Sequence, residues 1–274
     1  MKHHTGSRLI HAALGCAACI LLPAATQGTP AAAKPIRALI LSGANNHDWR
    51  TTTPALKQIL EDSGFFTVEV TELPARLPAN ALSKYDVLVG NWNIFGAPTP
   101  VQWPRPLMDA FTNFIRRGGG FVVVHAGGST LYDWPEFQRL VGASWGARTG
   151  HGPPHSFRVE IADTNHPVTA GMAPFTTTDE LWHRIATNND IHVLATAFSV
   201  PDKGGSGRNE PVAFVTQWDR GRCFNLVLGH DADAMKADGF CTLLVRGTEW
   251  AATGKVTEPV IRKKYAHEPP GRTP

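Results

Sequence analysis

The chain has 274 residues, of which 42% are hydrophobic, and a formal net charge of +3. It has no basic stripe and no run of five or more like charges, so nucleic acid is not an expected partner. A chain of this length can bury one sizeable core, and a single domain is the default expectation.

Residues 1–33 have the composition of a secretory signal peptide. They contain no acidic residue, carry Lys2 and Arg8 near the front, and continue with an apolar run over residues 9–22 and a segment of small residues. The run is shorter than the ~20 residues that a membrane-spanning helix needs. We therefore expect an exported protein, periplasmic or extracellular, that has no membrane span after the signal is removed.

The following part of the chain alternates segments of strand and helix character. Apolar runs typical of buried strands occupy residues 36–41, 66–70, 87–89 and 121–125, and helical patterns cover 53–62 and 107–117. This order predicts an α/β fold whose sheet has a parallel core and helices on both faces.

Beyond Trp145 the pattern is less regular. Strands are expected at residues 156–161, 192–197, 211–218 and 223–228, with a flexible hairpin loop at 202–209 and a last helix at 239–252. The predicted domain spans residues 34–256, and residues 257–274 are expected to form an extended tail. Cys223 and Cys241 are predicted to lie beyond disulfide distance and to remain buried thiols.

Polar and aromatic residues follow four of the predicted strands. In doubly wound sheets, ligands bind beyond the carboxyl ends of the strands, so these residues are the candidates for a small polar ligand. They are His47, Asp48 and Trp49; Asn91 and Trp92; His125, Gly127 and Ser129; and His230 and Asp231.

Several blocks of the sequence, in order, resemble the ThuA-like proteins, a family named after trehalose utilisation. The matching blocks are residues 38–43 (ALILSG), 47–49 (HDW), 119–127 (GGFVVVHAG), 150–155 (GHGPPH), 166–168 (HPV), 179–182 (DELW) and 228–231 (LGHD). The resemblance implies a flavodoxin-like fold similar to that of class I glutamine amidotransferases, in which a catalytic cysteine occupies the turn after a central strand.

The corresponding turn here has His125 and Ala126 at its centre. Thiol-dependent glutaminase chemistry is therefore not expected. Ser129 lies a little beyond the turn and is expected only as a hydrogen-bond donor. His125 is either a residue of the site, where glycines let the backbone approach a ligand, or a satisfied core histidine.

His230 and Asp231 stand where the amidotransferases carry their catalytic histidine and acid. An imidazole beside an acid can act as a general base near neutral pH, and the alternative is that His230 only caps a helix or bonds a loop carbonyl. Glu180 is the preferred catalytic acid. His47 and Asp48 either bind ligand or cap the next helix, and His166 with Asp163 is expected to form a structural turn.

His151 and His155 have the spacing of a zinc-binding pair, but the intervening Gly152, Pro153 and Pro154 exclude a helix. The two imidazoles can hold a divalent metal, bond sugar hydroxyls, or merely brace the loop. Residues 179–183 set acids and an imidazole, His183, beside an indole, a combination suited to carbohydrate. Trp49, Trp92 and Trp182 are the stacking candidates, and Trp103, Trp145 and Trp250 are expected in the core.

The family resemblance implies a role in the use of trehalose or related glycosides, and some relatives are thought to isomerise oxidised (keto) sugars. Acid/base chemistry with histidines is the leading hypothesis, with His230 and Asp231 as the base and His125, His151, His155 or a metal as the polarising group. A metal-dependent hydrolase and a non-catalytic sugar-binding module are the alternatives.

Overall fold

A computed structural model describes residues 1–3, 34–95, 102–188 and 190–260. The described residues from 35 to 260 form one compact unit. The predicted signal peptide and most of the predicted tail lie outside the described residues. Within the described part of the chain, no helix is both long and apolar enough to cross a membrane.

A mixed sheet of nine strands runs through this unit, in the order β2-β1-β3-β4-β13-β12-β11-β7-β8. Its first five strands are parallel and the other four continue the sheet in antiparallel pairs, so the predicted parallel core is confirmed. The strands are β1 (Ile36–Leu41), β2 (Phe66–Thr71), β3 (Val87–Gly90), β4 (Gly120–Val124), β13 (Gly221–Leu226), β12 (Asn209–Trp218), β11 (His192–Phe198), β7 (His155–Ile161) and β8 (Phe175–Asp179).

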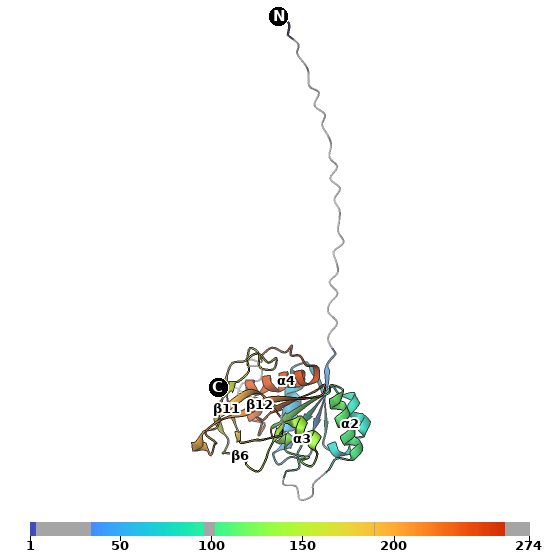
Figure 1. The fold of residues 1–274 in the computed structure, drawn as a ribbon, viewed down its shortest axis with the longest axis vertical. Coiled ribbons are helices and arrows are strands. Elements are labelled where there is room, and N and C mark those ends of the chain that lie inside the picture. Colours follow the sequence, from blue (N-terminus) through green and yellow to red (C-terminus); the bar gives the residue numbers. More distant parts are fainter. Residues whose placement is uncertain (4–33, 96–101, 189, 261–274) are drawn as a thin grey trace, which may run out of the picture. The chain divides into compact units, whose positions relative to one another are not determined.

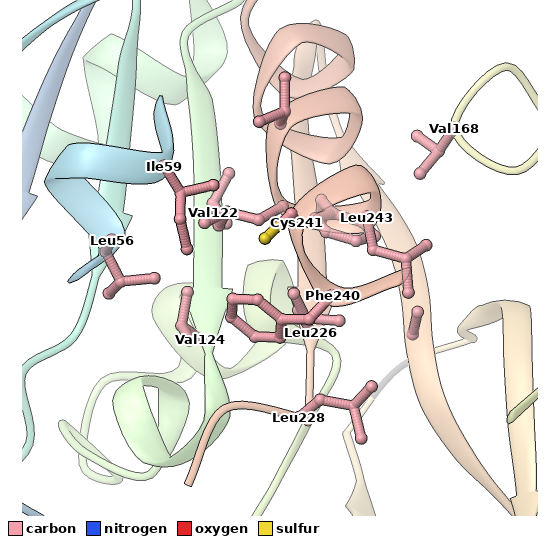
Figure 2. Close-up of a cluster of buried hydrophobic side chains, with 14 of the residues drawn as sticks. Leu56, Ile59, Val122, Val124, Val168, Leu226, Leu228, Phe240, Cys241 and Leu243 are labelled. Carbon is pink, nitrogen blue, oxygen red and sulfur yellow. The ribbon is translucent and has the colours of Figure 1, made fainter. Parts of the chain in front are cut away.

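Successive side chains of the central strand β4 point to opposite faces of the sheet. They are apolar on both faces, and helices cover both. Val122 and Val124 of β4 pack with α1 (Trp49–Asp62) and α4 (Asp238–Thr253), as Figure 2 shows. Phe121 and Val123 pack on the other side with α2 (Arg105–Arg116) and α3 (Pro135–Val141). Figure 1 shows α4 and α2 on either side of the sheet. Each such buried side chain contributes roughly 1.5–3 kcal/mol.

Short elements complete the fold around the strand ends. Two small ladders join β10 to β5 and β6 to β9. The short strands are β5 (Ala143–Ser144), β6 (Gly150–His151), β9 (Trp182–His183) and β10 (Ala186–Thr187), and the 3-10 helices are η1 (Pro74–Arg76), η2 (Ala79–Lys84), η3 (His125–Gly128), η4 (Pro201–Lys203) and η5 (Ala234–Lys236).

Several local expectations are confirmed. The chain returns from β11 to β12 as an antiparallel hairpin, and Cys223 and Cys241 are both buried free thiols. Asp163 accepts the backbone N–H groups of Asn165 and His166, so the segment around His166 is a structural turn.

The boundaries of two segments differ from the sequence-based expectation. Helix α1 begins at Trp49, earlier than residue 53, because Asp48 caps it by accepting the backbone N–H of Arg50. At the C-terminal end of the domain, the backbone N–H groups of Thr257 and Glu258 donate to the carboxylate of Glu249 in α4. The first two residues of the predicted tail are therefore bonded to the domain.

Candidate active site

Three imidazoles converge on one carboxylate oxygen of Glu180. The Oε2 atom of Glu180 lies 3.1 Å from Nε2 of His125, 3.0 Å from Nδ1 of His230 and 3.7 Å from Nε2 of His47. The indole N–H of Trp182 donates to the same oxygen over 3.3 Å. The Glu180 side chain is only 5% exposed, so these groups replace water around it.

Sheet topology explains why residues so distant in sequence meet. His47 follows β1, His125 follows β4 and His230 follows β13, and these parallel strands end at the same edge of the sheet. Glu180 reaches this edge from the short connection between β8 and β9. The polar strand ends recognised in the sequence are thus brought together here.

The turn that carries His125 has an unusual backbone. His125 has φ of 46°, a left-handed conformation that costs free energy for a residue with a Cβ atom. Its ring is fixed at both nitrogens, because Nδ1 lies 2.6 Å from the carbonyl oxygen of Val227 and Nε2 faces Glu180. The strained turn therefore aims the imidazole at the carboxylate.

The carboxylate of Asp179 fixes the backbone of the loop that carries His230. Its carboxylate accepts the backbone N–H groups of Gly229, His230 and Glu180, over 2.7, 3.1 and 2.7 Å. Burial raises the pKa of Asp179, against the lowering effect of His125 and of these hydrogen bonds. This residue ties the Glu180 segment to the His230 segment.

A fourth imidazole, that of His151, approaches Glu180 from the open side. Strand β6 pairs with β9, which places His151 opposite Trp182. The Nδ1 atom of His151 contacts Oε1 of Glu180, the oxygen that the other three imidazoles leave free. Its side chain is 42% exposed, so this is the imidazole of the site that meets solvent most.

The imidazoles control the charge of Glu180. Burial by itself would raise the pKa of Glu180, but the surrounding imidazoles of His125, His230 and His47 outweigh burial and hold this pKa far below the usual range. The carboxylate is therefore ionised at neutral pH. In turn, burial lowers the pKa of His47, whereas the hydrogen bond to Glu180 raises that of His230.

A cavity of about 100 Å³ opens beside this carboxylate. It adjoins a second cavity of about 270 Å³, and Phe95 and Ser129 line both. The first is lined by Asn46, His47, Phe95, Ala126, Ser129, Trp145, His151, Glu180 and Trp182. The combination of charged, amide, hydroxyl and aromatic groups suits a small polar ligand that also has an apolar face.

A comparison with protein-family models identifies the family of this chain. The model of the ThuA family, described as trehalose utilisation, matches residues 37–251. The chain belongs to the ThuA family. This membership supports a role in carbohydrate utilisation.

Solved structures agree with this assignment. A ThuA-like protein from Parabacteroides merdae is 32% identical, with a TM-score of 0.74 over 83% of this chain and 93% of that one. A ThuA-like protein from Bacteroides uniformis is 20% identical, with a TM-score of 0.62 over 84% and 98% of the two chains. A β-galactosidase from Rahnella sp. R3 shares the fold alone, at 15% identity and a TM-score of 0.53 over 80% of this chain and 32% of that one. Among curated proteins, none matches the chain in sequence.

In this ThuA family member, some predicted ligand-binding residues have structural partners instead. Asp48 caps α1, and the guanidinium of Arg50 lies 4.3 Å from the ring of Trp49. The side-chain amide of Asn91 donates to Thr52 and Thr53. Trp92 is buried in the core beside Trp103, 6.2 Å between ring centres, so it does not stack on a ligand in the cavity.

The acid expected to assist His230 is also placed differently. The carboxylate of Asp231 accepts the backbone N–H of Ala234, the first residue of η5. The hydrogen-bonded carboxylate partner of His230 is Glu180. In the structure, the carboxylate hydrogen-bonded to His230 is thus that of Glu180 and not that of Asp231.

Gly127, His155 and His183 stand apart from the cavity lining. A Cβ atom on Gly127 would lie 1.9 Å from the carbonyl oxygen of Gly90, so this glycine permits close packing of two strand ends and not of a ligand. Nδ1 of His155 lies 2.9 Å from the Pro153 carbonyl oxygen. His183 is buried against Gly150.

Other residues of the site were not singled out from the sequence. Trp145, expected in the core, is partly exposed and lines the cavity, with its ring centre 5.0 Å from that of Trp182. The side-chain oxygen of Asn45 accepts from Asn93 and holds the ring of His47. Both asparagines lie in strand ends whose polarity was the available signal.

One group of side chains can hold a metal. The donor atoms of His47, His125, Glu180 and His230 all lie within 4.8 Å of one another. The pair predicted from the sequence, His151 and His155, is not this group. His151 instead contacts Glu180 from the cavity side.

Proposed function

We propose that the protein is an exported isomerase of oxidised (keto) sugars, which works by proton transfer between the carbonyl carbon and the carbon next to it. The observation that carries this proposal is the pair formed by His151 and Glu180 at the wall of the cavity. Membership of a trehalose-utilisation family supports a sugar as the substrate.

His151 is the proposed proton acceptor. Glu180 is a poor base, because a carboxylate whose pKa is held so low binds a proton only weakly. Nδ1 of His151 lies 2.9 Å from the carbonyl oxygen of Gly152 and also contacts Oε1 of Glu180; both oxygens are acceptors, so Nδ1 carries the proton and Nε2 keeps the lone pair. His151 thus takes the role that the sequence suggested for His230.

The proposed reaction is balanced without a further reactant. His151 removes a proton from the carbon next to the carbonyl, the C–H electron pair forms the C=C bond of an enediol, and the carbonyl oxygen takes up a proton. His151 then returns the proton to the former carbonyl carbon, while the hydroxyl group on the neighbouring carbon gives up its proton to water and becomes the new carbonyl group, which gives an isomer of the same formula. Ser129 and Asn46, which line the cavity, can donate hydrogen bonds to the oxygen.

The shape of the site also favours a sugar. Trp145 and Trp182 present indole surfaces beside Glu180 and His151, as expected for a ligand with C–H faces and hydroxyl groups. The adjoining cavity, with Leu131 and Tyr132 in its wall, provides further room for a second ring of a disaccharide. Neither His125 nor Ala126 can form the acyl intermediate of a cysteine amidotransferase.

Proton exchange tests the proposal. Trehalose oxidised to a ketone at one ring carbon is incubated with the protein in D₂O and followed by NMR. We expect deuterium next to the carbonyl and a new isomer, a rate at least about 100-fold lower in His151→Asn, and no loss in His192→Gln, an exposed histidine paired with Asp163. Saturable binding without exchange would indicate a sugar-binding module, and release of free glucose a hydrolase.

Export has a separate test. The composition of residues 1–33 supports cleavage of a signal peptide near residue 33. Cell fractionation and intact-mass measurement of the expressed full chain should find the protein outside the cytoplasm, with the N-terminal segment removed. A full-length cytoplasmic product would contradict export without affecting the proposed reaction.

A further inference from the structure

Two of the imidazoles around Glu180, those of His125 and His47, direct Nε2 toward the carboxylate and have an oxygen atom beside Nδ1. Nδ1 of His125 lies 2.6 Å from the carbonyl oxygen of Val227. A carbonyl oxygen can only accept a hydrogen bond, so Nδ1 of His125 carries the proton. A neutral ring then has its lone pair on Nε2, the atom that faces Glu180.

His47 is arranged in the same way. Its Nδ1 lies 3.1 Å from the side-chain oxygen of Asn45. That atom also accepts the backbone N–H of His47 and the side-chain amide of Asn93, which identifies it as the oxygen of the amide group. Nε2 of His47 therefore also directs a lone pair toward Glu180.

These lone pairs face a carboxylate oxygen, which is itself an acceptor. The alternative is that the rings are doubly protonated, but the centre of the His47 ring lies only 4.7 Å from that of His125 and 4.8 Å from that of His230. Several imidazolium groups so close together in a site with little water would repel one another. A single cation among the four side chains satisfies all of the acceptors at once.

We propose that His47 Nε2, His125 Nε2, His230 Nδ1 and Glu180 Oε2 bind a divalent transition-metal ion, with Zn²⁺ as the ion to test first. Three imidazoles and one carboxylate form a donor set that suits Zn²⁺. The contacts of His125 with Val227 and of His47 with Asn45 are the outer hydrogen bonds that fix the orientation of metal-binding histidines.

The ion site shares Glu180 with the proposed isomerase, and only the role of the ion in catalysis rests on that function. Oε1 of Glu180 remains in contact with His151, so metal binding through Oε2 does not displace the proposed base. An ion beside the cavity would polarise the carbonyl oxygen of a bound sugar.

Metal binding is measured without any substrate. The purified protein is stripped with a chelator, dialysed, and titrated with Zn²⁺ by calorimetry and with Co²⁺ by visible absorption. We expect about one ion per chain and the d–d bands of Co²⁺ bound by nitrogen ligands. His47→Asn and Glu180→Gln should each weaken Zn²⁺ binding by about 10-fold or more, whereas His192→Gln should bind as the unaltered protein does.

The outcomes separate the two proposals. Failure of the unaltered protein to bind either ion, or equal binding by the folded His47→Asn and Glu180→Gln variants, overturns the metal site. Proton exchange by the stripped protein alongside such a failure would leave the isomerase standing. Binding of one ion without exchange on the keto sugar would instead support the metal site and remove the isomerase. Circular dichroism of each variant checks that it is folded.

Discussion

The backbone N–H of His230 donates to the carboxylate of Asp179 over 3.1 Å. Since Asp179 precedes Glu180, this bond joins the two segments whose side chains meet in the site. Asp179 is a positioning residue, because it holds backbone and not ligand. The geometry of the contact between His230 and Glu180 therefore depends on Asp179, which precedes Glu180 and holds the backbone of His230.

Asp179→Ala should destabilise the fold strongly. It removes the acceptor of three backbone N–H groups in a side chain with little exposure, which should cost roughly 2–5 kcal/mol. Asp163→Ala is the matched control, because Asp163 accepts two backbone N–H groups in a far more exposed turn. Urea unfolding of both variants gives the comparison, and equal losses would contradict the role assigned to Asp179.

Gly127→Ala should be destabilising for a steric reason. The new methyl group would lie 1.9 Å from the Gly90 carbonyl oxygen, so the ends of β3 and β4 must separate, at a cost of about 1–3 kcal/mol or more. Gly64→Ala is the control: the new methyl group lies in open space, so the only destabilisation is that of a φ of 78° for a residue with a Cβ atom. Thermal melting should show the larger loss for Gly127→Ala. A larger loss for Gly64→Ala would refute the close packing.

The left-handed backbone of His125 gives a third prediction. His125→Val and His125→Asn both remove the imidazole, but asparagine tolerates a φ of 46° and a β-branched residue does not. His125→Val should be less stable than His125→Asn by about 1–2 kcal/mol in chemical denaturation. Equal stability would mean that the turn relaxes once the imidazole is gone.

The sequence was sufficient to predict the parallel core, most strands and a ligand site at the strand ends that carry His47, His125 and His230, because the apolar runs are clear and parallel strands end at a common edge. It did not show which of the histidines converge, nor the role of Asp231, since an acid that holds backbone and a catalytic acid look alike beside a histidine. Hydrogen bonds between segments decide such cases. The contact of Asp179 with Gly229 joins residues 50 positions apart, and no local pattern encodes it.

The pair of Arg37 and Asp86 predicts a pH dependence of stability. Hydrogen bonds from Arg37 lower the pKa of Asp86, and the two side chains are 2.8 Å apart. A lowered pKa in the folded state means that the carboxylate stabilises the fold above its unfolded pKa of about 3.9, and that this contribution is lost as the pH falls through the folded pKa.

Melting curves of Asp86→Asn and the unaltered protein should therefore differ at pH 7 and approach each other below about pH 3. The difference should be small, because the side chains of Arg37 and Asp86 are 53% and 40% exposed and water screens the pair. Arg37→Gln should show the same pH pattern. A difference that grows on acidification would have the wrong sign for this pair.

Trp145 and Trp92 are expected to differ in what their substitution changes. Trp92 is 5% exposed and packs in the core, so Trp92→Phe should lower stability, whereas Trp145 lines the cavity and packs only in part. Trp145→Phe should keep the melting temperature within a few degrees, since little buried area is lost. It should weaken the binding of the keto disaccharide several-fold, because the larger indole face beside Glu180 is gone. Calorimetric titration and thermal melting of the two variants measure both effects, and unchanged sugar binding in Trp145→Phe would remove this indole from the ligand surface.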